Sequence, residues 1–343
     1  MLHFLLMIGV LLVNLGTPDA PDTTSVRRYL REFLMDGRVI DIPYVFRSLL
    51  VNGIIAPFRA PKSAKVYQQL WEHRGSPLKF YGEDNAHDLQ EVLGNQYAVR
   101  LAMRYQNPSL DSVLKEFEFM NLTKLIVIPL FPQYASATTG SVYERVMGIM
   151  KSWQIMPELK VVNYFYNHPD FAKYFAKKAS KYQKEHDFDH YIFSYHGVPE
   201  RHIRKGDLSK STCAFGTCCQ QITEKNHACY RAQCFETSRL IAKEMGLKEG
   251  EYTTAFQSRL GRDPWLQPYT DETIKKLTKE GKKNILAFSP AFVADCLETT
   301  IEVGEEYKEL FEENGGQHWQ LVESLNNSKE WVEILECIVK SGK

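Results

Sequence analysis

The sequence of 343 residues lacks the motifs that identify most nucleotide-using enzymes. It contains neither a phosphate-binding loop with its lysine nor the glycine fingerprint of dinucleotide sites. Its formal net charge is zero, with 42 basic and 42 acidic side chains, and it has no basic arm that would favour nucleic acid. We therefore expect no nucleotide cofactor and no nucleic-acid partner.

Long apolar runs are also scarce. The most apolar stretch, residues 1–15, has no basic start and no small-residue cleavage motif. It is also shorter than the roughly 20 residues that a membrane span needs. We interpret it as the first buried strand and expect a cytoplasmic protein. Peripheral association with a membrane and the oligomeric state are not decided by the sequence.

Apolar runs alternate with helical patterns along the chain, which is typical of an α/β protein with parallel sheets. The length favours two domains, so we predict two similar doubly wound halves, residues 1–155 and 156–315, and a C-terminal helical segment, 316–343, that packs back on the first. Predicted strands are 9–14, 97–103, 124–129, 160–162, 191–194, 252–257 and 284–288; predicted helices are 24–34, 63–72, 109–120, 141–153, 169–185, 231–245, 270–280, 296–313 and 328–339.

Two predicted strands lead to residues with catalytic chemistry. The strand at 191–194 runs into His196 and a Gly-Val-Pro turn, which places the imidazole at the carboxyl edge of the sheet, where ligands bind. The last strand leads through an apolar segment to Glu298, with Asp295 and Glu302 at helical spacing on one face. A histidine near partly buried carboxylates indicates a metal or proton-transfer site. A solvated acidic helix face is the competing interpretation.

Two further loops follow strands and carry residue types that bind ligands. The loop after residue 257 mixes Trp265 and other aromatic side chains with Arg259 and Arg262, which suits a flat apolar ligand with acidic groups at its rim. Residues 131–141 place small hydroxyl side chains before a helix, where an anion can bind. Structural loops with exposed arginines are the alternative.

Five of the seven cysteines fall within one irregular segment. Their spacing, C-x4-C-C-x9-C-x4-C, lacks the paired C-x-x-C units of zinc ribbons. Such clustering in a long chain of cytosolic type indicates a metal site before it indicates disulfides. An iron–sulfur cluster, structural Zn²⁺ and free thiols are the three alternatives. The five cysteines are Cys213, Cys218, Cys219, Cys229 and Cys234.

These segments together resemble the ferrochelatases, the enzymes that insert Fe²⁺ into a porphyrin at the end of haem synthesis. Two positions depart from the family pattern: Leu15, where some relatives carry Met, and Cys296, where many carry a second His. His196 is therefore the only imidazole in the matching motifs. The resemblance rests on residues 14–18, 26–34, 74–78, 103–105, 132–134, 138–140, 194–197, 257–259, 264–266 and 295–299.

The resemblance implies two Rossmann-like domains around an interdomain porphyrin cleft. It implies that His196 and Glu298 form the catalytic and Fe²⁺-binding pair. The need to carry two protons away from the porphyrin then suggests Asp295 and Glu302 as a relay. The substrate would be protoporphyrin IX or coproporphyrin III, and the products haem and two protons. The residues implied for porphyrin binding are Arg59, Tyr67, Arg104, Tyr105, Ser136, Trp265 and Phe292.

Some ferrochelatases carry a [2Fe-2S] cluster at an insert in the same place as the cysteine-rich segment, near 208–230. The resemblance implies Cys213, Cys218, Cys219 and Cys229 as its ligands, with Cys234 as the alternative to one of them. Two other functions stay open at this point. They are a chelatase for cobalt or nickel in another tetrapyrrole pathway, and a tetrapyrrole- or metal-binding protein without turnover.

Overall fold

In the computed structural model, which describes residues 7–259, 261 and 263–341, the chain divides into two units. Unit 1 comprises the described residues of 1–131, 135–163 and 326–343, and unit 2 comprises 132–134 and 164–325. The boundaries therefore fall later than predicted, because 156–163 belong to unit 1 and 316–325 to unit 2. Each of these two segments contributes an edge strand to its sheet. Arg262, predicted as a rim cation, lies outside the described residues.

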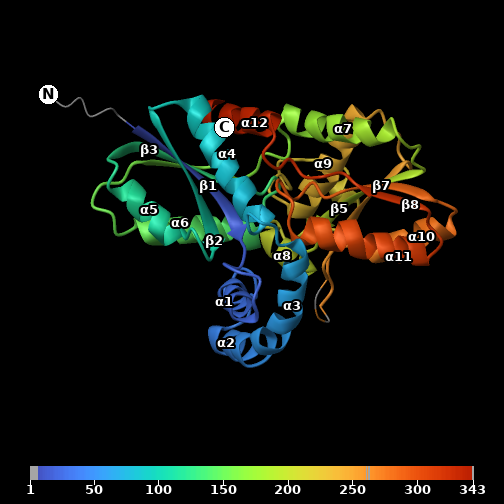
Figure 1. Ribbon diagram of the computed structural model, residues 1–343, viewed down its shortest axis with the longest axis horizontal. Helices are drawn as coiled ribbons and strands as arrows, with labels where there is room; N and C mark the ends of the chain where they lie inside the picture. Colours follow the sequence, from blue (N-terminus) through green and yellow to red (C-terminus); the bar gives the residue numbers. More distant parts are fainter. Residues whose placement is uncertain (1–6, 260, 262, 342–343) are drawn as a thin grey trace. The chain divides into compact units, whose positions relative to one another are not determined.

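Unit 1 contains a parallel sheet in the order β2-β1-β3-β4 (Figure 1). Its strands are β1 (Met7–Gly16), β2 (Tyr97–Tyr105), β3 (Leu122–Pro129) and β4 (Glu158–Val161). Residues 10–13 of β1 have no exposed surface, as expected for a central parallel strand covered on both faces. Leu11 and Val13 pack with α5 (Leu110–Glu118) and α6 (Ser141–Met150) in one core cluster.

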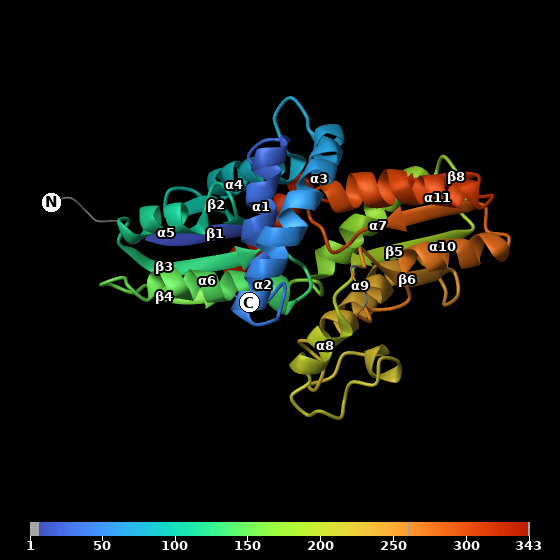
Figure 2. The same cartoon turned by 90° about the horizontal axis from the view of Figure 1, so that it is seen from below.

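The remaining helical elements of unit 1 lie partly against this sheet and partly beyond one end of it (Figures 1 and 2). They are α1 (Thr23–Leu34), α2 (Tyr44–Leu50), the π-helix η1 (Val51–Ile55), α3 (Ala56–Leu70), α4 (Pro77–Leu93), the π-helix η2 (Ser136–Gly140) and α12 (Lys329–Ser341). The C-terminal segment that carries α12 is bonded to α4, because Asn85 Nδ2 donates to Asn326 O at 3.0 Å.

Unit 2 repeats the same strand order, β6-β5-β7-β8. Its strands are β5 (His190–His196), β6 (Tyr252–Gln257), β7 (Asn284–Phe288) and β8 (His318–Leu321). One face of the sheet packs on α10 (Thr270–Lys279) and α11 (Tyr307–Glu313). The other helical elements are α7 (Pro169–Gln183), α8 (Glu200–Gly206), the 3-10 turn η3 (Thr217–Cys219), α9 (Tyr230–Glu244) and the π-helix η4 (Leu297–Glu306).

The segment predicted as a helix over 296–313 differs from the expectation. Leu297–Glu306 is a π-helix, and only Tyr307–Glu313 is an α-helix. Cys296 is the N-cap, so Asp295 precedes the helix and does not lie on its face. The prediction was wrong here because side-chain spacing does not distinguish i→i+4 from i→i+5 hydrogen bonds.

Seven of the described elements were not predicted: α2, η1, α4, η2, α8, η3 and β8. Start and stop signals are present for α4, with Pro77 in its first turn and Gly94 at its C-cap, but the predicted helices omit it. β8 is an edge strand of only four residues, two of them polar. Within the described residues, no helix combines the length and the apolar character that crossing a bilayer requires.

Candidate active site

His196 is the last residue of β5 and lies half-buried at the carboxyl edge of the unit 2 sheet. Its Nδ1 atom lies 2.7 Å from the carbonyl oxygen of Gly197. A carbonyl oxygen can only accept, so this contact assigns the proton to Nδ1 and leaves the lone pair on Nε2. Nε2 is therefore the imidazole atom that can accept a proton or bind a metal ion.

Gly197 allows the chain to turn sharply after the histidine. Its N–H donates to the carbonyl oxygen of Gln257 at 2.8 Å. A Cβ atom at this position would lie 2.8 Å from the same oxygen and 3.2 Å from Cε3 of Trp265. Only glycine fits without a backbone shift, which explains why the turn at the end of this strand begins with one.

Gln257 ends β6 beside His196, and its side chain is buried with the residue 2% exposed. Its Nε2 donates to the backbone oxygen of Glu298 at 2.9 Å and to Oε2 of Glu302 at 3.0 Å. Its Oε1 accepts from Ser194 Oγ at 2.7 Å. One amide thus joins the ends of β5 and β6 to the π-helix. Its only local signal in the sequence is a polar residue at the end of a buried strand, which does not by itself predict a site residue.

Glu298 is half-buried in the first turn of the π-helix η4. The N-cap residue Cys296 is buried and shares a hydrogen bond with Glu298. The N–H of Cys296 donates to Thr299 Oγ1 at 2.9 Å, which fixes the start of the helix. Single π-helical turns are rare and occur frequently at functional sites. The helix start therefore holds Glu298 at the same sheet edge as His196.

The other two predicted carboxylates are bonded to their own neighbours. Glu302 accepts from the hydroxyl groups of Ser258 and Tyr307, the latter at 3.1 Å. Asp295 Oδ1 accepts from Thr299 Oγ1 at 3.2 Å and from the N–H of Ser324 at 3.1 Å. These contacts hold both carboxylates in place within the edge of the site.

No three of the predicted metal-binding side chains meet in a closed cage. Within residues 7–259, 261 and 263–341, the metal-ligand atoms of three such residues approach within 4.8 Å of one another only at His87, Asp88 and Glu91. That group lies on the surface of α4, outside the predicted site.

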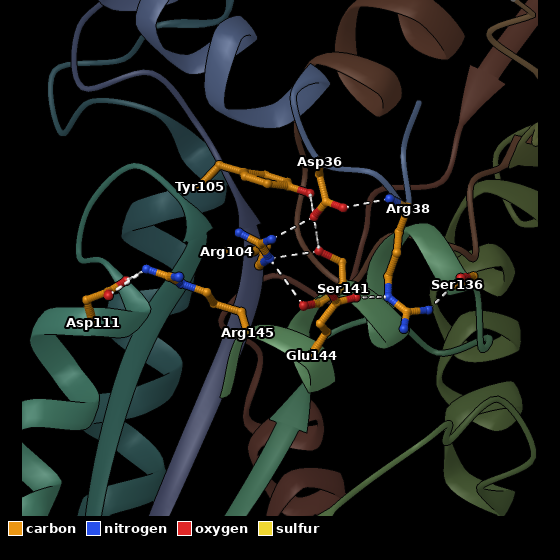
Figure 3. A network of polar contacts seen from close by, with 9 residues as sticks. All are labelled: Asp36, Arg38, Arg104, Tyr105, Asp111, Ser136, Ser141, Glu144 and Arg145. Atoms are coloured by element: carbon orange, nitrogen blue, oxygen red, sulfur yellow. Dashed lines mark hydrogen bonds and ion pairs between the residues drawn. The ribbon is translucent and has the colours of Figure 1, made fainter. Parts of the chain in front are cut away.

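In unit 1, the predicted residues Arg104 and Tyr105 end β2 and meet a carboxylate that the sequence analysis missed (Figure 3). Asp36 Oδ2 accepts from Arg104 Nη2 at 2.6 Å, from Tyr105 OH at 2.9 Å and from Ser141 Oγ at 2.5 Å. The side chains of Arg104 and Asp36 are 15% and 8% exposed, so this is a buried ion pair. In the sequence, Asp36 lies just after the predicted helix 24–34 and indicates only the end of that helix.

The electrostatics of this network keep Asp36 charged. Burial raises the pKa of Asp36, but the hydrogen bond from Ser141 and the charge of Arg104 outweigh burial, so the pKa lies below its usual value. Burial, together with the charge of Asp36, raises the pKa of Tyr105, which stays a neutral phenol. Tyr105 has no exposed surface, so its ring has no open face toward a ligand in this conformation.

The three other predicted residues of unit 1, Ser136, Arg59 and Tyr67, differ in their exposure to solvent. Ser136 begins η2, and its hydroxyl accepts from Arg38 Nη1 at 3.0 Å (Figure 3). Arg59 is exposed on α3, whereas Tyr67 on the same helix is 8% exposed. Of these three residues, Arg59 is exposed, Ser136 is half-buried and Tyr67 is buried.

Trp265 and Phe292 in unit 2 are half-buried. Trp265 forms a β-bridge with Pro199, directly after the His196 turn. Arg259, expected as a rim cation, instead pairs with Asp271 and Glu272 of α10, at 2.9 and 3.0 Å. Its charge is therefore compensated within the protein.

The cysteines of the insert form one interacting group. Cys218 Sγ lies 3.8 Å from Cys219 Sγ and accepts from the N–H of Ala214 at 3.4 Å. The hydrogen bond from Cys219 lowers the pKa of Cys229, against the effect of burial, and Cys213 interacts electrostatically with Cys218 and Cys219. Backbone N–H groups that donate to cysteine sulfur stabilise the thiolate form, which is the form that binds a metal.

Cys234 differs from the other four in its burial. It has no exposed surface within α9, shares a hydrogen bond with Tyr230 and interacts electrostatically with Cys219. Cys296 and Cys337 lie outside the insert, and no disulfide links any of the seven cysteines, all of which are described. Among the described residues, no three cysteine sulfurs lie within 4.8 Å of one another.

Comparison with known proteins identifies the family of the chain. A family profile described as ferrochelatase matches residues 7–343. A ferrochelatase from Legionella pneumophila (strain Lens) is 46% identical over 331 residues, which cover 96% of this chain and 98% of that protein. A ferrochelatase from Coxiella burnetii (strain Dugway 5J108-111) is 42% identical over 335 residues, covering 98% and 94%. The solved structure of SirB from Bacillus subtilis with Fe3+ shares the fold, with a TM-score of 0.53, 9% identity and coverage of 98% and 96%.

Proposed function

The chain belongs to the ferrochelatase family, and from this premise we propose how its residues insert Fe²⁺ into a porphyrin to give haem. Insertion requires that two pyrrole protons leave the macrocycle and that Fe²⁺ exchanges its water ligands for nitrogen. The observation that carries the proposal is the tautomer of His196. Because Nδ1 donates to Gly197 O, Nε2 faces the reaction with its lone pair.

Glu298 complements this imidazole. We propose that its carboxylate receives a proton from His196 or shares the incoming Fe²⁺ with it. Gln257 fixes the backbone of Glu298 and binds Glu302, so the proton has a second carboxylate near its path. Asp295, held by Thr299, is the remaining member of this relay.

The direct test is iron insertion by the purified protein under anaerobic conditions. We expect H196A to lower kcat by more than about a hundredfold, the usual scale for a general base. H190A is the matched control, since His190 begins the same strand and contacts Thr253 at the opposite edge. Normal insertion by a folded H196A variant would refute the assigned role. The same assay with Co²⁺ and Ni²⁺ in competition measures the choice of metal.

Seven residues are predicted to bind porphyrin, and we propose two modes of action for four of them. Arg59 and Trp265 contact the substrate directly, and Arg59 pairs with a propionate. Arg104 and Tyr105 act through the buried network around Asp36. R59A should raise the porphyrin KM several-fold, whereas K62A, an exposed cation one turn along α3, should not. Equal KM values for R59A and wild type would remove Arg59 from the site. Tyr67, Ser136 and Phe292 complete the proposed set.

The R59A variant also tests which porphyrin is the substrate. Protoporphyrin IX carries two propionates and coproporphyrin III four, so the cations at the site decide between them. We propose a comparison of kcat/KM for both porphyrins with the wild-type protein. If R59A affects only one of the two substrates, Arg59 recognises the carboxylates that distinguish them.

We also propose that Cys213, Cys218, Cys219 and Cys229 hold a [2Fe-2S] cluster. When bound, the cluster would crosslink four thiolates of the insert and make its packing sensitive to oxidants. Anaerobically purified protein should contain two iron and two sulfide per chain and show the visible absorption of such a cluster. C219S should lose both, whereas C337S, an exposed cysteine of α12, should keep them. One zinc and no sulfide would replace this assignment with a structural zinc site.

C234S decides between the two proposed ligand sets. Cys234 is bonded to Tyr230 inside α9, so we expect the cluster to survive this substitution. Loss of iron and sulfide in C234S, with retention in one variant of the other four, would make Cys234 the fourth ligand.

We propose peripheral membrane association as a further property of unit 1. Apolar side chains are exposed along α2, η1 and α3, where Phe46, Leu49 and Phe58 are 65%, 66% and 75% exposed. F58E should reduce flotation with lipid vesicles. F119E is the control, because Phe119 is 78% exposed and lies outside this cluster. Equal flotation of the two variants would reject the surface.

A further inference from the structure

A single hydrogen bond joins the end of the catalytic strand to the start of α9. The phenol of Tyr230, the first residue of α9, donates to the backbone oxygen of His196 at 2.7 Å. Tyr230 is 8% exposed, so the bond forms away from solvent. An unpaired carbonyl oxygen at such a place would be costly, and the phenol therefore fixes the position of that peptide.

The same helix start carries the cysteine insert. Figure 2 shows the insert as a loop that leaves α8 and returns to α9. Cys229 is the N-cap of α9 and shares hydrogen bonds with the Cys219 thiol and with the N–H groups of Arg231 and Ala232. The insert is thus bonded to the first turn of α9, one residue before Tyr230.

The bond from Tyr230 and the contact that orients the His196 ring involve the carbonyl groups of consecutive residues. Tyr230 binds the carbonyl of His196, and Nδ1 of His196 binds the carbonyl of the next residue, Gly197. A displacement of the first turn of α9 would move the carbonyl oxygen of His196 and, with it, the peptide against which the ring is oriented. Arg231, the next residue of that turn, also donates to Gln267 O at 3.1 Å, in the loop that carries Trp265.

We propose that Tyr230 is a positioning residue through which the packing of the cysteine insert sets the orientation of His196. This inference rests on the proposed role of His196 and goes beyond it, because it assigns a function to the insert in the reaction. No electron transfer is involved. The insert acts mechanically, by holding the first turn of α9 in register with the end of β5.

The test removes one oxygen atom. Y230F keeps the ring and deletes the bonds to His196 O and to the Cys234 thiol, and we expect kcat to fall about fivefold while the porphyrin KM stays within about twofold. In porphyrin-free protein, the imidazole titration of His196, followed by NMR, should shift. Y195F is the matched control, since this buried phenol lies 3.0 Å from Ser238 Oγ on the same helix and does not contact His196 O. It should leave kcat and the titration unchanged.

A double-mutant cycle tests the link to the insert. C219S should lower kcat in the wild-type background and change it little in Y230F, because the connection is already broken. Fully additive effects, or a Y230F variant that behaves like Y195F, would overturn the proposal. If the wild-type protein inserts no iron, the proposed function fails instead. The His196 titration then still reports whether Tyr230 and Cys219 act on the imidazole.

Discussion

Replacing Gln257 with methionine tests whether the site depends on the amide that joins its three elements. Methionine has a similar length and fills the same buried space, but it cannot make the three hydrogen bonds of the amide. The variant loses the bonds to the backbone oxygen of Glu298 at 2.9 Å, to Glu302 at 3.0 Å and from Ser194 at 2.7 Å.

The expected loss of stability follows from these partners. Two neutral bonds contribute about 1 kcal/mol each and the bond to a carboxylate about 2 kcal/mol, which gives a gross loss of about 4 kcal/mol. Part is recovered, because Ser194 Oγ keeps Thr270 Oγ1 at 2.9 Å and Glu302 keeps its two hydroxyl donors. We therefore expect the free energy of unfolding to fall by about 3 kcal/mol in urea titrations.

Activity should fall as well, because Glu298 loses the bond that fixes its backbone. We expect kcat for iron insertion to drop at least about tenfold, equivalent to about 1.4 kcal/mol. Q133M is the matched control: Gln133 is 2% exposed in the same unit and donates to Thr237 Oγ1 at 3.1 Å and to Pro290 O at 3.3 Å. It should lose stability and keep kcat within about twofold. Equal losses of kcat in Q257M and Q133M would refute the reasoning.

Three further substitutions probe the two units. D36N leaves Arg104 buried without its counter-charge and should cost about 3 kcal/mol of unfolding free energy at pH 7. Because the folded-state pKa of Asp36 is lowered, this difference should vanish as the pH falls through that pKa, and a pH-independent difference in urea titrations would contradict it. Burial lowers the pKa of His190 to about 4. The unfolded chain therefore binds an extra proton below pH 6.5, so the wild type should lose about 2 kcal/mol between pH 6.5 and pH 5. H190L should lack this slope, and an unchanged slope would show that another group causes it. G197A places a Cβ atom 2.8 Å from Gln257 O, so the turn must shift; kcat should fall, and a normal rate would show that the turn tolerates the displacement.

The strand ends could be predicted from the sequence because their signals are local. A run of apolar residues that stops at a polar one marks the carboxyl edge, and this placed His196 and Glu298 correctly at one edge of the unit 2 sheet. The partners of these residues could not be predicted in the same way. Asp36 lies 68 positions before Arg104, and Gln257 lies 45 before Glu302. Only the folded chain brings such pairs together, and no spacing rule links them.

The two units share a local pattern at the end of the central strand. β1 and β5 hold the same place in their sheets, and a Gly-x-Pro sequence begins at the last residue of β1, Gly16, and directly after the last residue of β5, at Gly197. A Cβ atom on either glycine would meet the last carbonyl of the neighbouring strand, at 2.0 Å in unit 1 and 2.8 Å in unit 2. β3 and β7 are each followed by a π-helix that contains Thr-Thr. At the matching positions unit 1 has Leu15 and Ala137, where unit 2 has His196 and Glu298. The repeated backbone supplies the edge and the close turn, and the two side chains that differ are the ones to which we assign metal binding and proton transfer.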